Sequence, residues 1–518
     1  MKNSGWFLLL LAFVEGAAVM VCELLGAKQL GVYFGSSLYA WSGVLGVTLG
    51  GLMIGYYLGG VLSGRKKDNY VFMILAIAGT LLAFMPTTGR WIMPKFIDYS
   101  VQTGTVLSLI VFMFPQLVLF GMTSPMIINA LNKNSGRAGK MAGSVYAIST
   151  FGGIISTFLM GFYLLPNFGV DMPAVFFGTV LISLSSIGLF KMKKSIPGIL
   201  SVALLSVCLA GYFGQKEYNS RKYKVVYSSE GILGQVKVVD QMFTTYTRGA
   251  REARILYVNN TAQSIIDKKN PEYSLWDWSY YMPSAASVFP AGSDVLLLGL
   301  GGGTLVKQFQ RLGYNVEAVE LDERIVDVTQ RLFSLDSKVP ITVDDGRHFI
   351  NTTKNKYDLI ALDLFHSETP PTQMISVEAF KMMKNRLNEG GMVIMNFYGY
   401  LTGKLGRSGR SVFRTFNAAG FDTKLLVTPG AEGARNLILL ACTDKKDFTK
   451  SEYTEPGLNP LGDLTRYFVE PETLDTTNTV VLKDDIPVLE KMYVDCAVEW
   501  RKGVNESFTK SFIREKIR

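Results

Sequence analysis

The chain has 518 residues with a net charge of +9, and 48% of its residues are apolar while only 18% are charged. Residues 1–215 hold thirteen of the 52 Lys and Arg but only five of the 43 Asp and Glu, so nearly all of the positive excess lies there. The rest of the chain is close to neutral, which argues against a nucleic-acid-binding surface. Two histidines and four cysteines without a CxxC spacing exclude a histidine-rich metal site and give no sign of a zinc site or a disulfide framework.

Residues 1–215 are predicted to form a multi-pass transmembrane helical domain of about seven spans, with the lipid bilayer as its partner. A helix needs roughly 20 apolar residues to cross a hydrocarbon core, and most of seven apolar stretches are long enough. The stretches cover residues 6–25, 38–62, 70–86, 104–131, 141–165, 172–190 and 196–213. The first holds two acids and is followed by further stretches, which is untypical of a cleaved signal peptide.

Two features inside these stretches bear on packing and function. Gly51, Gly55 and Gly59 recur every fourth residue, so they line one helix face that can approach a neighbouring helix closely. Glu15 and Glu23 are costly in lipid and should face protein or water. They either pair with a polar neighbour or contact a cation or polyamine.

The second part of the chain is predicted to be soluble. Over residues 216–290, alternating apolar and polar side chains with β-branched content predict a small β-rich subdomain. Over residues 291–518, strands alternate with helices, which predicts a nucleotide-binding α/β domain with a doubly wound, methyltransferase-like (Rossmann-like) sheet. Residues 444–518 carry no motif and could cap the sheet or mediate self-association, so a homodimer is left open.

The elements expected in this α/β domain follow one another with short connections. Strands are expected at 294–300, 314–321, 339–343, 357–364, 391–397, 422–427 and 435–442, and helices at 304–312, 323–333, 346–353, 376–388 and 406–419. In such sheets the ligand lies at the carboxyl ends of the strands.

Four of the expected strand ends carry groups that suit an adenosyl nucleotide. A glycine turn after the first strand lets the backbone approach a ligand; its glycines are Gly299, Gly301, Gly302 and Gly303. Glu320 ends the second strand, where a carboxylate can accept both ribose hydroxyl hydrogen bonds. Asp345 and Gly346 follow the third strand, where an acid can take the adenine amino group, and Asp363 ends the fourth. A nicotinamide dehydrogenase would want a further glycine two residues after the turn, and the sequence has none there.

Several runs resemble those of the polyamine aminopropyltransferases, the spermidine synthase family. In the soluble part they are SSEGILGQVKVVD, LYVNNTAQS, SYYMPSAASVFP, VLLLGLGGGTLVKQF, VEAVELDERIV, VDDGRHFI, YDLIALDLF and LNEGGMVIMNF. The run AVMVCELLGAKQL and the glycine-rich stretch after it resemble the membrane region fused to one branch of that family. The resemblance covers about residues 15–62 and 225–400. It implies transfer of an aminopropyl group from decarboxylated S-adenosylmethionine, as co-substrate and without a metal, to putrescine or a similar small amine.

The resemblance also implies site roles. Glu320 matches the family's ribose contact, Asp345 its adenine contact, and Asp363 the acid that orients and deprotonates the attacking amine. A primary amine with a pKa of about 10 is almost fully protonated at neutral pH, so the nucleophile needs a positioned base. His366 either accepts or relays that proton or is a polar loop residue, and Glu368 is one candidate for holding the far ammonium group.

Other matches are partial. Gln263 matches a cofactor-contacting glutamine of the β subdomain, and Tyr280 or Tyr281 matches a tyrosine that lines the polyamine slot. Two departures remove negative charge from a pocket meant for cationic amines. Gly302 stands where the family's glycine loop carries an aspartate, and His366 stands where a second acid follows Asp363.

These departures keep two alternatives open. The chain could be an S-adenosylmethionine-dependent methyltransferase that kept the fold and lost the polyamine pocket. It could also be a non-enzymatic transporter or sensor that binds a polyamine or nucleoside, which only Glu15 and Glu23 support.

The side of the membrane on which the soluble domain lies follows from the loop charges and the number of spans. Basic residues gather near 65–67, 133–140 and 191–194, and the positive-inside rule places these loops in the cytoplasm. Seven spans would then put the soluble domain outside, whereas adenosyl cofactors are made in the cytosol. We favour a cytosolic domain, which requires that one stretch, 70–86 or 196–213, does not span.

Overall fold

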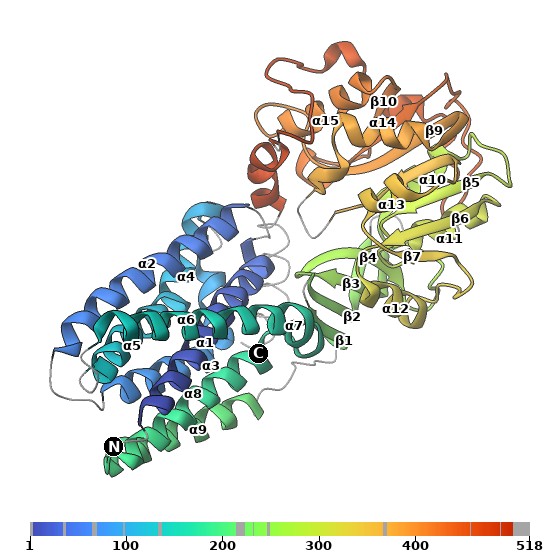
Figure 1. The fold of residues 1–518 in the computed structure, drawn as a ribbon. Coiled ribbons are helices and arrows are strands. Elements are labelled where there is room, and N and C mark those ends of the chain that lie inside the picture. The colour runs from blue at the N-terminus through green and yellow to red at the C-terminus, as the bar shows by residue number, and fades with distance from the viewer. Residues whose placement is uncertain are drawn as a thin grey trace. The chain divides into compact units, whose positions relative to one another are not determined.

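The computed structural model describes residues 4–34, 38–64, 70–96, 99–132, 137–213, 223–231, 233–245, 249–365, 370–455, 457–486 and 488–500. The chain divides into two compact units. One comprises Met1–Glu217 with Ser229–Gln235, and the other comprises Tyr218–Ser228 with Val236–Arg518. The first unit is helical and the second is built around two sheets (Figure 1).

The first unit consists of long apolar helices. They are α1 (Ser4–Phe34), α2 (Leu38–Ser63), α3 (Tyr70–Ile92), α4 (Val101–Phe112), α5 (Phe114–Asn132), α6 (Ala138–Leu159), α7 (Leu165–Phe168), α8 (Asp171–Lys191) and α9 (Ser195–Phe213). Within the described residues, six helices are long and apolar enough to cross a membrane. The sequence predicts seven, and the difference lies at α9, whose apolar stretch over Ile196–Val207 is shorter than the six. The expected single helix at 104–131 is interrupted at Met113.

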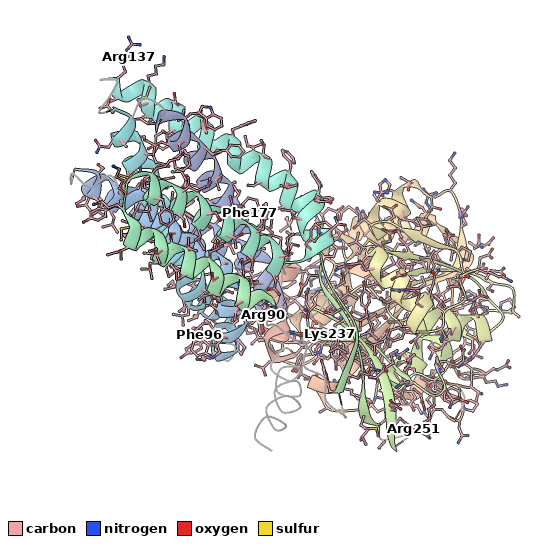
Figure 2. All side chains as sticks on the ribbon, turned by 90° about the horizontal axis from the view of Figure 1, so that it is seen from below. Arg90, Phe96, Arg137, Phe177, Lys237 and Arg251 are labelled. Carbon is pink, nitrogen blue, oxygen red and sulfur yellow. The ribbon has the colours of Figure 1, made fainter. Side chains whose placement is uncertain are left out.

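Small residues let these helices approach one another, as the glycine spacing predicts. A Cβ on Gly55 would overlap the carbonyl oxygen of Val118 in α5, so a larger residue there would push α2 away. The outer surface of the unit is apolar: Leu49 is 69% exposed and Phe162 is 76% exposed. Such surface suits contact with lipid tails. Figure 2 shows Arg137 at one end of the helical unit and Arg90 toward the other.

A four-stranded sheet, most of which lies in the second unit, forms the β-rich subdomain that the sequence predicts, and its β2–β3 and β3–β4 pairs are antiparallel. Its strands are β1 (Tyr223–Gly231), β2 (Gly234–Thr245), β3 (Gly249–Val258) and β4 (Thr261–Asp267), in that order. Alternate side chains of this sheet, such as Val238 and Leu256, form an apolar cluster with Val328 and Phe333 of the larger α/β part. This contact fixes β4 beside the larger sheet.

The larger sheet has seven strands in the order β10-β11-β9-β8-β5-β6-β7. They are β5 (Asp294–Leu298), β6 (Asn315–Glu320), β7 (Ile341–Val343), β8 (Tyr357–Leu362), β9 (Leu387–Tyr398), β10 (Asp422–Val427) and β11 (Asn436–Cys442). Strands β5 to β9 pair in parallel, and β11 runs antiparallel to both β9 and β10. The fold is the methyltransferase-like α/β fold that the sequence predicts.

Helices cover both faces of this sheet (Figure 1). They are α10 (Tyr281–Ala286), α11 (Thr304–Arg311), α12 (Glu323–Leu332), α13 (Gly346–Thr352), α14 (Val377–Asn385) and α15 (Arg407–Ala418). Alternate residues of each strand face opposite sides: Leu297 packs with α10 and α11, whereas Leu296 packs with α13, α14 and α15. The C-terminal stretch covers both faces of the sheet. Phe448 belongs to the apolar cluster around Leu297, and Tyr493 belongs to the cluster around Leu296 on the opposite face.

Candidate active site

The glycine turn lies between β5 and α11, at the carboxyl edge of the sheet. Gly299 adopts a φ of +90°, which disfavours any side chain. A Cβ at this position would also overlap the carbonyl oxygen of Asp363. The Asp363 amide in turn donates to the Leu298 carbonyl at 2.9 Å. Glycine at 299 therefore lets the ends of the first and fourth predicted strands meet.

Glu320 closes the turn from the neighbouring strand. Its Oε2 accepts the backbone N–H of Leu300 at 3.0 Å, and its Oε1 accepts that of Asp322 at 2.9 Å. The side chain is 9% exposed. Burial raises the pKa of Glu320, and the backbone N–H donors oppose that shift by stabilising the carboxylate. The carboxylate is thus held at the end of β6, directly against the turn.

The small sheet supplies the other wall of the turn. Ser264 of β4 is buried, and its Oγ accepts the backbone N–H of Gly302 at 2.7 Å. A Cβ added at Gly302 would lie 2.7 Å from the Ser264 Cβ and 2.9 Å from the Phe333 ring. No larger side chain fits at 302 without a shift. The adjacent Gln263 lies on the same strand, and its carbonyl oxygen would be 3.8 Å from a Cβ added at Gly301.

Asp345 and Gly346 lie where the third predicted strand gives way to a helix. The Asp345 Oδ1 accepts the backbone N–H groups of Arg347 at 2.8 Å and His348 at 3.1 Å, so Asp345 is the N-cap of α13. The preceding amide, that of Asp344, donates to the Glu320 carbonyl at 3.0 Å. This bond places the start of α13 next to the end of β6.

Asp363 follows β8 and is held by a chain of amides. Asn396 of β9 donates its Nδ2–H to the Asp363 Oδ1 at 2.9 Å, and Asn436 of β11 donates to the Asn396 Oδ1 at 2.8 Å. The second bond fixes which end of the Asn396 amide faces the carboxylate. Burial raises the pKa of Asp363 to about 6, against the lowering effect of the Asn396 hydrogen bond. Asp363 is therefore a stronger base than an ordinary aspartate.

Three residues of this edge are not among those that the sequence predicts for the site: Ser264, Asn396 and Asn436. A signal for Asn396 exists, because it is the one polar residue in the apolar run Met392–Phe397. No comparable signal marks Ser264 or Asn436. Their roles depend on β4 and β11 being brought beside strands that are distant in the sequence.

The two predicted tyrosines make contacts elsewhere. The Tyr280 hydroxyl donates to the carbonyl of Asn459, and burial raises the pKa of Tyr280 to about 12. The Tyr281 ring meets the Tyr467 ring edge-on at 5.3 Å. Both side chains thus contact the C-terminal stretch, and their predicted place beside the acceptor amine stays a prediction.

The structure brings together Gly299, Gly301, Gly302, Gly303, Glu320, Gln263, Asp345, Gly346 and Asp363 along one edge of the sheet. His366 and Glu368 lie outside the residues that the structure describes. The gathered groups combine a bare backbone turn, a buried carboxylate beside it and a second carboxylate two strands away from the first. This arrangement can hold a nucleoside and present a base next to it.

The chain is similar in sequence to proteins described as spermine/spermidine synthases and polyamine aminopropyltransferases. Residues 282–399 match the family model described as Spermine/spermidine synthase domain. A probable polyamine aminopropyl transferase of Bifidobacterium longum is 25% identical over 223 residues, which cover 40% of this chain and 50% of that protein. The chain thus spans about half the length of this relative. Polyamine aminopropyltransferase 2 of Aquifex aeolicus is 22% identical over 397 residues, which cover 74% of this chain and 77% of the relative.

Solved structures of two other proteins align with about half of the chain. A probable spermidine synthase from Corynebacterium glutamicum aligns with a TM-score of 0.36 and 18% identity, over 46% of this chain and 85% of the other. Spermidine synthase from Thermotoga maritima aligns with a TM-score of 0.33 and 14% identity, over 52% of this chain and 87% of the other.

Proposed function

We propose, on the premise that residues 282–399 belong to the spermine/spermidine synthase family, that the chain is a membrane-bound aminopropyltransferase. Its co-substrate would be decarboxylated S-adenosylmethionine and its acceptor putrescine or a similar small amine. The observation that carries this proposal is the convergence of the glycine turn, Glu320 and Asp363 on one sheet edge.

The nucleoside half of the co-substrate fits the first part of this edge. In this proposal the Glu320 carboxylate accepts the ribose hydroxyls while its backbone donors hold it in place. The turn offers close backbone approach because no side chain protrudes from Gly301 or Gly302. Asp345, at the N-cap of α13, would accept a hydrogen bond from the adenine amino group. Gln263 lies beside the turn on β4 and would cover the sulfonium side.

The reaction would be a displacement at the propyl carbon bonded to sulfur. The acceptor nitrogen forms a bond to that carbon, the C–S bond breaks, and sulfur keeps the electron pair as a neutral thioether. The leaving group needs no proton, so the protein's work falls on the nucleophile. At pH 7 an amine with a pKa of about 10 must lose a proton at a cost of roughly 4 kcal/mol.

Asp363 would take that proton and hold the nitrogen in line. With a pKa of about 6 the carboxylate is mainly ionised at neutral pH and yet accepts a proton more readily than an ordinary aspartate. The amides of Asn396 and Asn436 orient it, so that its second oxygen can face the amine. His366 and Glu368 keep their predicted roles as a proton relay and an ammonium contact.

A second candidate is methyl transfer from ordinary S-adenosylmethionine. The observation in its favour is the crowding at Gly302 by Ser264 and Phe333, which leaves no room for the family's aspartate in the turn. Without that acid, the site has lost one attraction for the free ammonium of a decarboxylated co-substrate. The two candidates differ in which form of the co-substrate binds.

The helical unit would anchor the enzyme by crossing the membrane. An even number of spans would return the chain to the side of its basic loops, which places the soluble domain in the cytosol, where the co-substrate is made. In this proposal α9 lies against α8 without a full crossing.

Titration of the full chain in detergent with decarboxylated and ordinary S-adenosylmethionine tests the proposal. We expect tighter binding of the decarboxylated form. A preference for the ordinary form would favour methyl transfer, and binding of neither would refute both candidates.

A further inference from the structure

A cavity of about 560 Å³ lies at the carboxyl edge of the large sheet, where β9 and β10 end. Both strands run in the direction of β8, so their ends share one edge. The lining comes from Arg435, just before β11, and from residues 401–403, 427–430, 466–469 and 473–475. Pockets that hold small molecules have volumes of roughly 300–1,000 Å³, so this cavity has the size of a ligand site.

The wall of the cavity combines apolar side chains with two guanidinium groups. Val427 and Phe468 contribute apolar surface, and Arg435 and Arg466 contribute positive charge. The Arg466 guanidinium lies 4.8 Å from the centre of the Tyr467 ring, a cation–π contact that holds it against the wall. A ligand that matches this wall has an apolar body and a negatively charged group.

Arg435 has hydrogen-bond donors to spare. One of its Nη atoms donates to the Glu432 Oε1 at 3.0 Å, and that same oxygen also accepts the backbone N–H groups of Leu401 and Thr402. The Arg435 Nε is buried and has no hydrogen-bond partner among the described residues. A native interior satisfies almost all buried polar groups, so this unpaired donor points to a missing acceptor. A ligand in the cavity that Arg435 lines can supply it.

A third guanidinium is buried behind the wall. Arg410 of α15 is 4% exposed, and its Nη groups donate to the carbonyl oxygens of Leu401 and Gly403, which both line the cavity. Within the described ranges, the carboxylate at ion-pair distance from Arg410 is that of Asp475, 3.9 Å away and 59% exposed. A buried charge is costly without a close counter-charge. This wall therefore gains from an added negative charge.

The charges of the wall do not balance. Within ion-pair distance of the three guanidinium groups, the part of the chain that the structure describes offers two carboxylates, those of Glu432 and Asp475. One positive charge is left over. A ligand with a single negative charge restores neutrality, and a planar guanidinium binds a carboxylate well because it offers paired N–H donors.

The cavity is a neighbour of the proposed active site and shares none of its residues. Thr428 lines the cavity, and its Oγ1 accepts the backbone N–H of Asn436 at 2.9 Å. The Asn436 side chain donates to Asn396, which in turn donates to Asp363. Two amides thus separate the cavity wall from the proposed base.

We propose that this cavity binds a small organic acid, with its carboxylate on Arg435 and Arg466 and its apolar body against Val427 and Phe468. A polyamine is a cation at neutral pH and is repelled by the same guanidinium groups, so the cavity is distinct from the site of the acceptor amine. The proposal does not depend on the aminopropyltransferase activity proposed above.

The test is titration of the full chain in lipid nanodiscs with 4-fluorobenzoate, a carboxylate on an apolar ring, followed by fluorine NMR. Empty nanodiscs give the background from lipid. We expect saturable binding that unlabelled benzoate displaces. Benzylamine has nearly the same size and the opposite charge, and we expect it not to displace the acid.

Variants of the two lining arginines locate the binding. Arg435→Gln should weaken it by about tenfold or more, because a hydrogen-bonded charge pair is lost. Arg435→Lys keeps the charge without the paired donors and should weaken it less. Arg466 is exposed, so Arg466→Gln carries little risk to folding and should weaken binding by roughly threefold.

Two control variants keep the outcomes separate. Arg331→Gln removes an exposed guanidinium from α12, 59% exposed, and should leave binding unchanged. Asp363→Asn disables the proposed enzyme base and should also leave it unchanged, so failure of the enzyme proposal would not imitate failure of this one. The proposal is overturned by absence of saturable binding, by equal displacement with benzylamine, or by wild-type affinity in monodisperse Arg435→Gln and Arg466→Gln variants.

Discussion

At the scale of single residues, Asp363 is the group on which the proposed chemistry depends. Replacing it with Asn keeps the shape and the contact with Asn396 but removes the base. We expect Asp363→Asn to leave the affinity for decarboxylated S-adenosylmethionine nearly intact while kcat falls by about 100-fold or more, the range of general-base contributions. Calorimetry and product formation measure the two quantities. Parallel loss of affinity and turnover would show that Asp363 holds the co-substrate instead.

Asn396 should set the pH dependence through Asp363. Its hydrogen bond stabilises the carboxylate, so Asn396→Ala should raise the pKa of Asp363 further above about 6. Because the ionised form is the base, the acid-side limb of kcat/KM should move to higher pH, by about one unit for a hydrogen bond to a charged group. Asn436→Ala should move it in the same direction and less far. An unmoved limb in both variants would leave the amides with a structural role only.

The residues of the site were predictable to different degrees. Glu320, Asp345 and Asp363 each end or follow a strand of a parallel sheet, and parallel strands place such residues at one edge. Asn396 and Asn436 depended on β9 and β11 becoming neighbours, and Ser264 on a contact between two sheets. Tyr280 and Tyr281 were expected near the acceptor amine from the resemblance alone, and the C-terminal stretch that contacts them carries no motif.

At the scale of elements, the geometry of the glycine turn restricts which residue can stand at position 299. Gly299 and Gly292 have nearly the same φ, +90° and +89°, but a Cβ on Gly292 would meet nothing within 4 Å. Gly292→Ala should therefore cost about 1–2 kcal/mol of stability from backbone strain alone. Gly299→Ala adds the overlap with Asp363, and we expect at least about 3 kcal/mol together with loss of co-substrate binding. Thermal unfolding and calorimetry of the matched pair measure both, and equal effects would contradict the close approach.

Strand and helix periodicity predicted most elements of the soluble unit, and the methyltransferase-like fold is confirmed. Periodicity does not specify direction, so the antiparallel insertion of β11 between β9 and β10 was not foreseen. In the helical unit, an apolar run does not show where its helix bends. The helix break at Met113 lies two residues before Pro115. The stretch is apolar on both sides of the break, so its hydropathy does not reveal the break.

At the scale of the whole molecule, the membrane topology is the open prediction. Single cysteines at Lys194, in a basic loop, and at Lys445, in the soluble unit, should both react with a membrane-impermeant maleimide only after the cytoplasmic side is exposed. Both variants are made in a Cys208→Ser background, because the other three native cysteines, Cys22, Cys442 and Cys496, are buried. Labelling of the Lys445→Cys variant from the outside of intact cells would mean that α9 crosses the membrane and that the soluble domain faces away from the cytosol.

The central claim about chemistry is that the chain transfers a propylamine group, with the nucleoside bound at the carboxyl edge of the sheet and the buried Asp363 acting as the base. Incubation of the full chain with decarboxylated S-adenosylmethionine and a panel of diamines, read by mass spectrometry, tests it most directly. We predict one diamine that gains an aminopropyl group with release of methylthioadenosine, and formation of that product about 100-fold slower or more with Asp363→Asn. Recovery of every diamine unchanged, while the protein binds the co-substrate, would contradict it.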